Sequence, residues 1–322
     1  MLYPFLFTPL FMERVWGGRN LERLFHKPLP PEKKIGESWE ISDRPEAMSV
    51  VANGPLQGKT LHWLVENHAR ELLGEAQASS QRFPLLVKIL DAADKLSLQV
   101  HPPAAAAAQL GGEPKTEMWY IVDAQPRAEI FAGLKKDTTR SGFETAVKSG
   151  EVEGCFHRIP VKKGDAMMIP SGRVHAIGAG NVIFEIQQNS DTTYRVHDWN
   201  RKGLDGKPRE LHIPQSLASI NFADFRPQLV IPEPIGNGGV KFEYLVDDPL
   251  FRVNVTHIRR NERFYLRSQG AQILGLFAGR LTVKAAGQEI SLRAGDFVLL
   301  PASLERISFH AEAHVDCLQV QF

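Results

Sequence analysis

The sequence predicts a mainly β protein built from two β-barrel units, with short helical insertions in its N-terminal half. Short β-branched and aromatic runs recur between Gly, Pro, Asp and Asn residues along most of the 322-residue chain, and such runs are typical of sandwiches and barrels. Helical periodicity is confined to a few segments. In addition, residues 163–171 and 294–302 share one pattern, Gly-Asp followed by four apolar residues and a proline.

This internal repeat predicts that one structural unit occurs twice. A Gly-Asp pair favours a tight turn, and the closing proline cannot donate a hydrogen bond to a further strand. Both copies therefore predict a turn that leads into a buried strand. His175 lies five residues after Pro170, whereas Arg306 lies five residues after Pro301. Only the first copy holds a histidine at this place.

The apolar N-terminus, residues 1–12, is expected to be strand or core-packing coil. It contains Pro4 and Pro9 and leads directly into Glu13, which is unlike a signal peptide or a membrane span. No uninterrupted apolar run of about 18 residues follows, so we expect no transmembrane helix.

Helices are expected at few places. Residues 60–73 carry Leu and Val on one face, with Thr60 as a candidate N-cap and Gly74 just past the end. Shorter helices are expected over 141–148 and 211–220, and the alanine run 104–108 predicts a short helical loop. The strand candidates are 85–90, 118–122, 166–169, 182–187, 272–277, 280–283, 289–292, 297–300, 306–309 and 317–321.

A linker is expected at residues 226–239, which contain three prolines and three glycines. We therefore expect two domains, residues 1–230 and residues 231–322. The first would be a catalytic, metal-binding domain with the helical insertions. The second would be a metal-free domain that packs against it, because Arg306 replaces the histidine.

Charge and cysteine content exclude several functional classes. Lys and Arg number 38 against 37 Asp and Glu, a net charge of +1, so no global positive field exists to hold nucleic acid or an anionic membrane. A local basic pocket would suffice for a small anionic substrate. Cys155 and Cys317 cannot form a disulfide framework, and a cytoplasmic location is expected. The sequence does not reveal the oligomeric state, and a monomer is the default expectation.

The chemistry-bearing residues are spaced as in the cupin superfamily. Gly164, Pro170, Gly172 and His175 match the second cupin motif, in which the histidine points into a jelly-roll barrel and binds a divalent metal. In place of the usual first-motif pair stand Gln99 and His101, two residues apart and therefore on one face of a strand. The alanine-rich loop that follows departs from the compact cupin spacing.

A carboxylate completes this candidate metal site. Glu117 follows the loop, and Lys115 shares its face by the same two-residue period. Two imidazoles, one carboxylate and one amide oxygen suit zinc and also manganese, iron or cobalt.

The chain resembles the short bacterial form of type I phosphomannose isomerase (mannose-6-phosphate isomerase). The resemblance spans residues 1 to about 220 and rests on VWGGRNL, IGESWEIS, LSLQVHP, KTEMWYI, IPSGRVHAIG and EIQQNSDTTYRVHDWNR. It implies interconversion of mannose 6-phosphate and fructose 6-phosphate with one bound Zn²⁺ per chain. The implied metal ligands are Gln99, His101, Glu117 and His175, and the implied catalytic residues are Arg195, Lys115 and Asp191.

Aldose–ketose isomerisation explains why such groups are needed. A proton moves between C2 and C1 through a cis-enediol, so charge must be stabilised where it develops and a base must reach the carbon-bound proton. Arg195 or Lys115 could support the enediolate or the phosphate. Asp191 is a candidate for proton transfer or ring opening, and a water molecule at the metal is an alternative base.

Other interpretations stay open at this point. Asp191 could cap a turn, and Arg195 could pair with Glu185 or Asp198. The three tryptophans Trp16, Trp39 and Trp119 are expected in the core. The alternative functions are an iron-dependent cupin oxygenase, and a sugar-responsive binding protein that has lost turnover.

Overall fold

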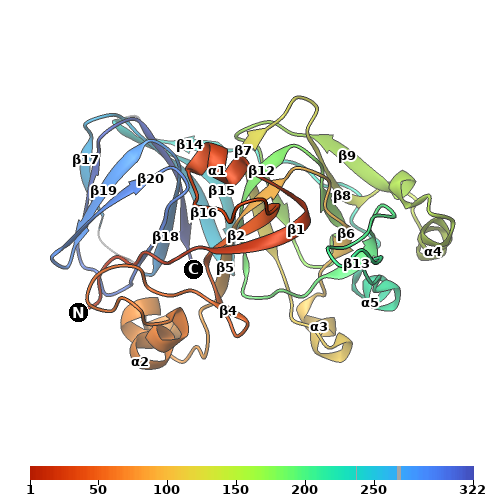
Figure 1. Ribbon diagram of the computed structural model, residues 1–322, viewed down its shortest axis with the longest axis horizontal. Coiled ribbons are helices and arrows are strands. Elements are labelled where there is room, and N and C mark those ends of the chain that lie inside the picture. The colour runs from red at the N-terminus through yellow and green to blue at the C-terminus, as the bar shows by residue number, and fades with distance from the viewer. Residues whose placement is uncertain (237, 267–269) are drawn as a thin grey trace.

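The computed structural model describes residues 1–236, 238–266 and 270–322, and it is built mainly of antiparallel β-strands (Figure 1). This confirms the predicted mainly β class. The strands of the N-terminal half are β1 (Leu10–Gly18), β2 (Ile35–Ile41), β3 (Asp43–Arg44), β4 (Ala47–Met48), β5 (Leu85–Ala92), β6 (Leu98–Val100), β7 (Glu117–Ala124), β8 (Glu129–Leu134), β9 (Phe156–Pro160), β10 (Ala166–Ile169), β11 (His175–Ile177), β12 (Asn181–Gln188) and β13 (Tyr194–His197).

The C-terminal half is also built of antiparallel β-strands. Its strands are β14 (Glu233–Ile235), β15 (Val240–Asp248), β16 (Phe251–Ile258), β17 (Arg263–Leu266), β18 (Gln272–Ala278), β19 (Arg280–Ala285), β20 (Gln288–Arg293), β21 (Phe297–Leu300), β22 (Ile307–Ala311) and β23 (Val315–Gln321). The residues 233–235 of the expected linker thus form an edge strand, because their backbone pairs with β15. The domain boundary after residue 230 stays a prediction.

The four larger sheets lie side by side as layers, and β3 and β4 form a separate two-stranded sheet. The N-terminal half holds a six-stranded sheet, β1-β2-β5-β12-β7-β10, and a five-stranded sheet, β13-β6-β11-β8-β9. The C-terminal half holds a six-stranded sheet, β14-β15-β16-β23-β18-β21, and a four-stranded sheet, β17-β22-β19-β20. The two six-stranded sheets occupy the middle of the molecule, and the largest apolar core lies between them (Figure 1).

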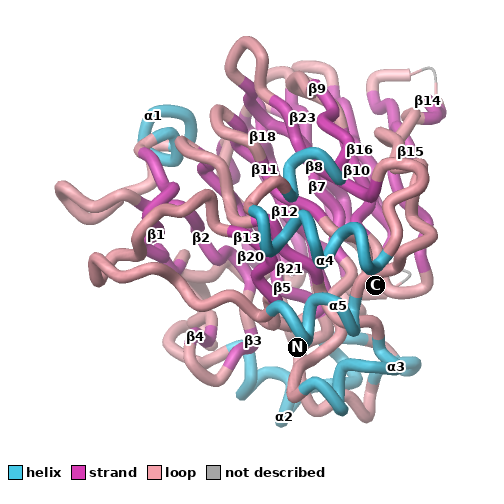
Figure 2. The backbone as a smooth tube through the Cα atoms, turned by 90° about the vertical axis from the view of Figure 1, so that its right-hand side faces the viewer, coloured by secondary structure: helices cyan, strands magenta, loops and turns pink. Residues whose placement is uncertain are grey.

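Helices cover the ends and one outer face of this stack. They are α1 (Asn20–Phe25), α2 (Leu61–Leu73), α3 (Ala104–Ala107), α4 (Arg140–Ser149) and α5 (Ile213–Ser219). α2 begins as predicted after Thr60, whose hydroxyl accepts a hydrogen bond from the Trp63 backbone N–H at 3.0 Å. α4 and α5 lie over the outer face of the five-stranded sheet, in front of the strands in Figure 2. No described helix has both the length and the hydropathy needed to cross a membrane.

The N-terminus packs against the C-terminal half. Phe5 forms a β-bridge with Leu299 on β21, and the carbonyl of Leu72 in α2 accepts a hydrogen bond from Ala302 at 3.0 Å. α2 and the N-terminus lie at the lower left of Figure 1. The expectation of strand or core-packing coil at residues 1–12 fits the structure: residues 2–5 and Phe7 are buried, and residues 10–12 begin β1.

The sequence repeat corresponds to a structural repeat. Gly164 and Gly295 adopt φ values of 93° and 89°, which favour glycine. The carboxylates of Asp165 and Asp296 each accept a hydrogen bond from a backbone N–H three residues earlier. The strands that follow, β10 and β21, each form the last strand of a six-stranded sheet.

One buried ion pair provides a test of this packing. Lys27 Nζ lies 2.8 Å from Glu40 Oε2, and both side chains are at most 6% exposed. Replacing Lys27 by Met leaves the Glu40 carboxylate buried without its partner, which costs about 3–5 kcal/mol. We therefore expect the free energy of unfolding of Lys27→Met, measured by urea denaturation, to fall by about that amount.

The matched control is Lys284→Met, which removes the exposed Lys284–Glu289 pair. Exposed pairs contribute about 0–1 kcal/mol, so this variant should unfold almost like the parent. Equal losses in both variants would contradict a stabilising role for the Lys27–Glu40 pair.

Candidate metal centre and active-site cavity

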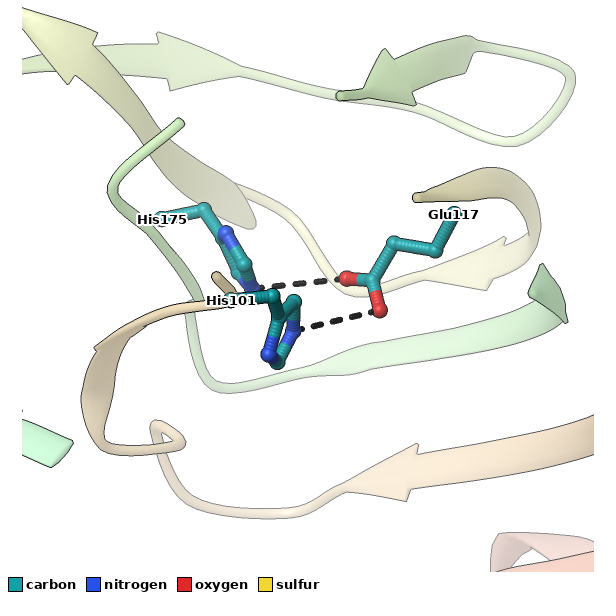
Figure 3. A group of neighbouring side chains, drawn as sticks. All are labelled: His101, Glu117 and His175. Atoms are coloured by element: carbon teal, nitrogen blue, oxygen red, sulfur yellow. Dashed lines mark ion pairs between the residues drawn. The ribbon is translucent and has the colours of Figure 1, made fainter. Parts of the chain in front are cut away.

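Three predicted ligands meet between the two sheets of the N-terminal half. His101 follows β6, His175 begins β11, and Glu117 begins β7 of the neighbouring sheet. His101 Nε2 lies 3.4 Å from Glu117 Oε2, and His175 Nε2 lies 3.3 Å from Glu117 Oε1 (Figure 3). All three side chains are buried, so residues that are far apart in the chain form one compact cluster.

Strand pairing explains why the fourth predicted ligand joins this cluster. β11 pairs with β6 in the register that sets His175 opposite Gln99. Gln99 Nε2 lies 3.2 Å from His175 Nε2. A 180° rotation of the side-chain amide of Gln99 would exchange its two end atoms, so that Oε1 rather than Nε2 would face the cluster.

Backbone carbonyls fix the tautomer of both imidazoles. His101 Nδ1 lies 2.8 Å from the carbonyl oxygen of Thr192, and His175 Nδ1 lies 2.9 Å from that of Arg173. A carbonyl only accepts, so each Nδ1 carries a proton and each Nε2 directs its lone pair toward Glu117. Metal-ligating histidines commonly have this arrangement.

The unsatisfied atoms of the cluster fit a divalent cation. Among the described residues, His101 Nε2 and both Glu117 carboxylate oxygens are buried without a well-aligned hydrogen bond. Buried polar groups rarely stay in that state. Burial and the nearby Lys115 ammonium lower the pKa of His101 to about 3, so its imidazole is neutral at pH 7. The nitrogen and oxygen donors present suit zinc and similar ions.

A cavity of about 600 Å³ adjoins the cluster. Gln99 and Lys115 belong both to its wall and to the surroundings of the cluster. The other charged side chains that line it are Glu13, Arg14, Glu37, Lys88, Glu185, Asp191, Arg195, Asp205 and Arg209. The cavity is therefore polar and could hold a small charged molecule beside the metal site.

Lys115 lies at the junction of cavity and cluster. Its ammonium is buried and lies 2.8 Å from Glu117 Oε2. Burial alone would lower the pKa of Lys115, but the carboxylates of Glu117 and Glu185 outweigh it and raise the pKa. Lys115 is therefore cationic in this arrangement.

Arg195 reaches the cavity from β13, where it pairs with Gln99 of β6. Its Nη1 donates to the carbonyl of Glu210 at 2.8 Å. Burial and the neighbouring Arg209 lower the pKa of Arg195. The suggested ion pairs of Arg195 with Glu185 or Asp198 do not form in the described structure, because Asp198 is engaged by Arg201 and Arg209.

Asp191 lies at the cavity wall with its side chain partly exposed. Its Oδ1 lies 3.7 Å from Lys88 Nζ. The structure therefore brings all seven predicted site residues to one cavity and its adjoining cluster.

The sequence analysis missed an ionic network on the floor of this cavity. Lys88 on β5 lies opposite Glu185 on β12, and its Nζ is 3.7 Å from Glu185 Oε2 and 4.0 Å from Glu37 Oε2. Burial and the repulsion of Glu117 raise the pKa of Glu185 to about 7. Each of these residues is a charge with mostly apolar neighbours inside a largely buried strand, and that pattern is the signal that could have revealed them.

The expected core tryptophans orient this network. Trp39 and Trp119 are buried, as predicted. The indole N–H of Trp39 donates to Glu37 at 2.7 Å, and that of Trp119 donates to Glu185 at 3.0 Å. Trp16 is also buried, and it lines the cavity.

The fold and the site together define a β protein with a His-Glu-His metal-type centre beside a charged cavity. Residues 5–145 match the family described as phosphomannose isomerase type I, catalytic domain. The mannose-6-phosphate isomerase of Streptococcus mutans is 36% identical over 313 residues, which cover 95% of this chain and 96% of that protein. Mannose-6-phosphate isomerase ManA of Bacillus subtilis is 45% identical over 219 residues, covering 67% and 68%.

Solved structures agree with these sequence matches. The crystal structure of the mannose 6-phosphate isomerase from Bacillus subtilis superimposes with a TM-score of 0.91 at 33% identity and covers 100% of both chains. A putative mannosephosphate isomerase from Archaeoglobus fulgidus, at 22% identity and a TM-score of 0.78, shares the fold. The chain belongs to the type I phosphomannose isomerase family.

Removal of a single imidazole tests the candidate metal centre. Because His175 supplies a preset Nε2 lone pair, we expect His175→Ala to lose the ion at this cluster. After gel filtration with a weak chelator it should retain one ion fewer than the parent chain, measured by inductively coupled plasma mass spectrometry. His68→Ala, at a partly exposed position in α2, is the control and should behave like the parent. Unchanged metal content in His175→Ala would remove His175 from the ligand set.

Proposed function

We propose that this chain interconverts mannose 6-phosphate and fructose 6-phosphate, with one zinc ion bound by Gln99, His101, Glu117 and His175. The observation that carries the proposal is the cluster of buried, unsatisfied donor atoms beside a cavity that holds several cations. Membership of the family supports the reaction, and relatives that cover most of this chain carry the name of the enzyme. Other divalent ions are compatible with the same donors.

The reaction needs stabilisation of negative charge at C1 and C2 of the open-chain sugar. A proton leaves one of these carbons and returns to the other through a cis-enediol, while charge develops on the adjoining oxygens. When bound, the divalent ion supplies the Lewis acidity that polarises such oxygens. The side chains of the cavity would bind the phosphate, transfer the proton and stabilise the remaining charge.

We propose that Lys115 stabilises the enediolate. It is cationic, buried and next to Glu117, so its charge acts in a poorly solvated environment where electrostatic stabilisation is strong. A lysine that stays protonated donates hydrogen bonds rather than accepting the carbon-bound proton. We therefore assign Lys115 to charge stabilisation.

Arg195 and Asp191 complete the proposed catalytic set. Arg195 presents a planar cation that can hold either the enediolate or the phosphate. Asp191 lies at the cavity wall and is our candidate for assisting ring opening or proton transfer. Its neighbour Lys88, 3.7 Å away, keeps this carboxylate close to the carboxylate of Glu185.

We further propose that the chain has the two domains that the sequence predicts. Residues 1–230 would form the catalytic cupin-type jelly roll, and residues 231–322 a second one with no metal in its interior, where Arg306 replaces the histidine. The substrate is a small sugar phosphate, and neither nucleic acid nor membrane is expected as a partner. Both cysteines are free, which fits a reducing cytoplasm; a monomer is the default oligomeric state.

A coupled assay tests the proposed reaction. Mannose 6-phosphate should be converted to fructose 6-phosphate by the holoenzyme, and removal of metal with a chelator should abolish conversion until zinc is returned. The measurement is glucose 6-phosphate formation through an added phosphoglucose isomerase and dehydrogenase. Full activity of a chain shown to be free of metal would refute the metal-dependent reaction, and oxygen consumption would indicate an oxygenase instead.

The catalytic assignment of Arg195 is tested separately. Arg195→Ala should keep its tightly bound metal and lose turnover by about 10²-fold or more, as expected when a group that stabilises developing charge is removed. Glu46→Ala, at an exposed position whose carboxylate pairs with Arg44, is the control for the preparation. Loss of metal together with turnover in Arg195→Ala would indicate a structural role.

A further inference from the structure

A second group of metal-type donors lies in the C-terminal half. His257 on β16 lies directly opposite Asp316 on β23, and His257 Nδ1 is 2.7 Å from Asp316 Oδ1. His314, just before β23, brings its Nε2 atom to 2.9 Å from the same oxygen. Each of the three residues offers one ligand atom within 4.8 Å of the other two. We propose that these residues bind a second divalent metal ion of the zinc class.

A further carboxylate lies within reach of this group. On the neighbouring strand β15, Glu243 Oε1 is 3.5 Å from His257 Nε2. Three adjacent strands of one sheet thus contribute side chains to the same face. Glu243 faces the other ring nitrogen of His257 and orients that ring, so the donor set is two imidazoles and the Asp316 carboxylate. This set favours zinc, cobalt or nickel over calcium or magnesium, which prefer oxygen ligands only.

The site lies at the seam between the two halves of the molecule. Side chains two residues apart share a face of a strand, and both Val255 and Leu318 belong to the core between the six-stranded sheets. His257 and Asp316 therefore lie on that face. Tyr120 of β7 packs across the same seam, with its ring 4.9 Å from that of Phe277 on β18.

The geometry needs little change to accept an ion. The present separations of 2.7 and 2.9 Å are hydrogen-bond lengths, at which protons on the imidazoles face the carboxylate. Ligands about 2.1 Å from a tetrahedral ion lie about 3.4 Å from each other. Small side-chain rotations open that distance, because His314 is 60% exposed and free to turn toward solvent.

This proposal does not conflict with the expectation that the interior of the second unit holds no metal. That expectation rests on Arg306 and concerns the space between the two C-terminal sheets. The apolar core in that space contains Ile258 and Cys317. Because these are the immediate neighbours of His257 and Asp316, His257 and Asp316 point to the other side of the sheet. The proposed ion lies on the opposite face of the same sheet. It is also independent of the catalytic proposal, because none of its ligands lines the active-site cavity.

Metal counting on the full chain tests the proposal. The parent, equilibrated in a buffer of micromolar free zinc and analysed by equilibrium dialysis with mass spectrometry, should hold one ion more than His314→Ala and one more than Asp316→Asn. His175→Ala should also hold one ion fewer than the parent, and the double variant with His314→Ala should hold neither. His310→Ala, a histidine on β22 outside the group, is the matched control and should hold as many ions as the parent.

Two further readouts separate a site from a structural ion pair. Zinc should raise the melting temperature of His175→Ala, which keeps only the second site, because an ion that binds the folded state alone stabilises it; His175→Ala/His314→Ala should show no rise. The isomerase activity of His314→Ala should equal that of the parent. A parent that binds a single ion, or undiminished zinc content in either His314→Ala or Asp316→Asn, would overturn the proposal and leave the catalytic metal site unaffected.

Discussion

The Glu117 carboxylate is the constraint on which the active site depends. It is fully buried between the two sheets of the N-terminal half, and no described residue gives its oxygens a well-aligned hydrogen bond. An isolated charge in such a place is costly. The ammonium of Lys115 holds it there and keeps the pKa of Glu117 well below its usual value despite burial, whereas the Nε2 lone pairs of His101 and His175 face its oxygens without a proton between them. A bound cation would complete this balance.

The layered fold explains how such a charged site can exist inside a stable protein. The inner six-stranded sheet packs one face against the C-terminal half through an apolar core. Its other face carries Glu37, Lys88 and Glu185, whose side chains line the cavity. Indole N–H groups and opposite charges satisfy these residues. The C-terminal half thus supports the site from behind without contributing residues to the cavity.

Much of this arrangement could be predicted, for physical reasons that operate locally. The Thr60 cap and Gly74 determine where α2 begins and ends, and the Gly-Asp turns determine β10 and β21. The two-residue period of strands places Gln99 beside His101 and Lys115 beside Glu117. Hydrogen bonding between strands that are far apart in the chain then brings these four residues close to His175. The sequence could indicate this long-range contact only through its resemblance to a known family.

Other features depend on tertiary contacts that leave no local signal. Residues 233–235 form β14 because an edge of the C-terminal sheet offers them a partner, although Pro234 and the prolines before it in the chain indicate a linker. Phe5 crosses to β21 for a similar reason. Lys88 and Glu185 become a pair only through the register of β5 and β12. The His257 group likewise arises from strands that are far apart in the chain.

X-ray diffraction recorded on both sides of the zinc absorption edge, on crystals of the zinc-loaded chain, addresses the central claim most directly. We predict an anomalous difference peak within bonding distance of His101 Nε2, His175 Nε2 and a Glu117 oxygen. A fully loaded crystal with no peak among these atoms would contradict the account, and the buried carboxylate would then need another explanation.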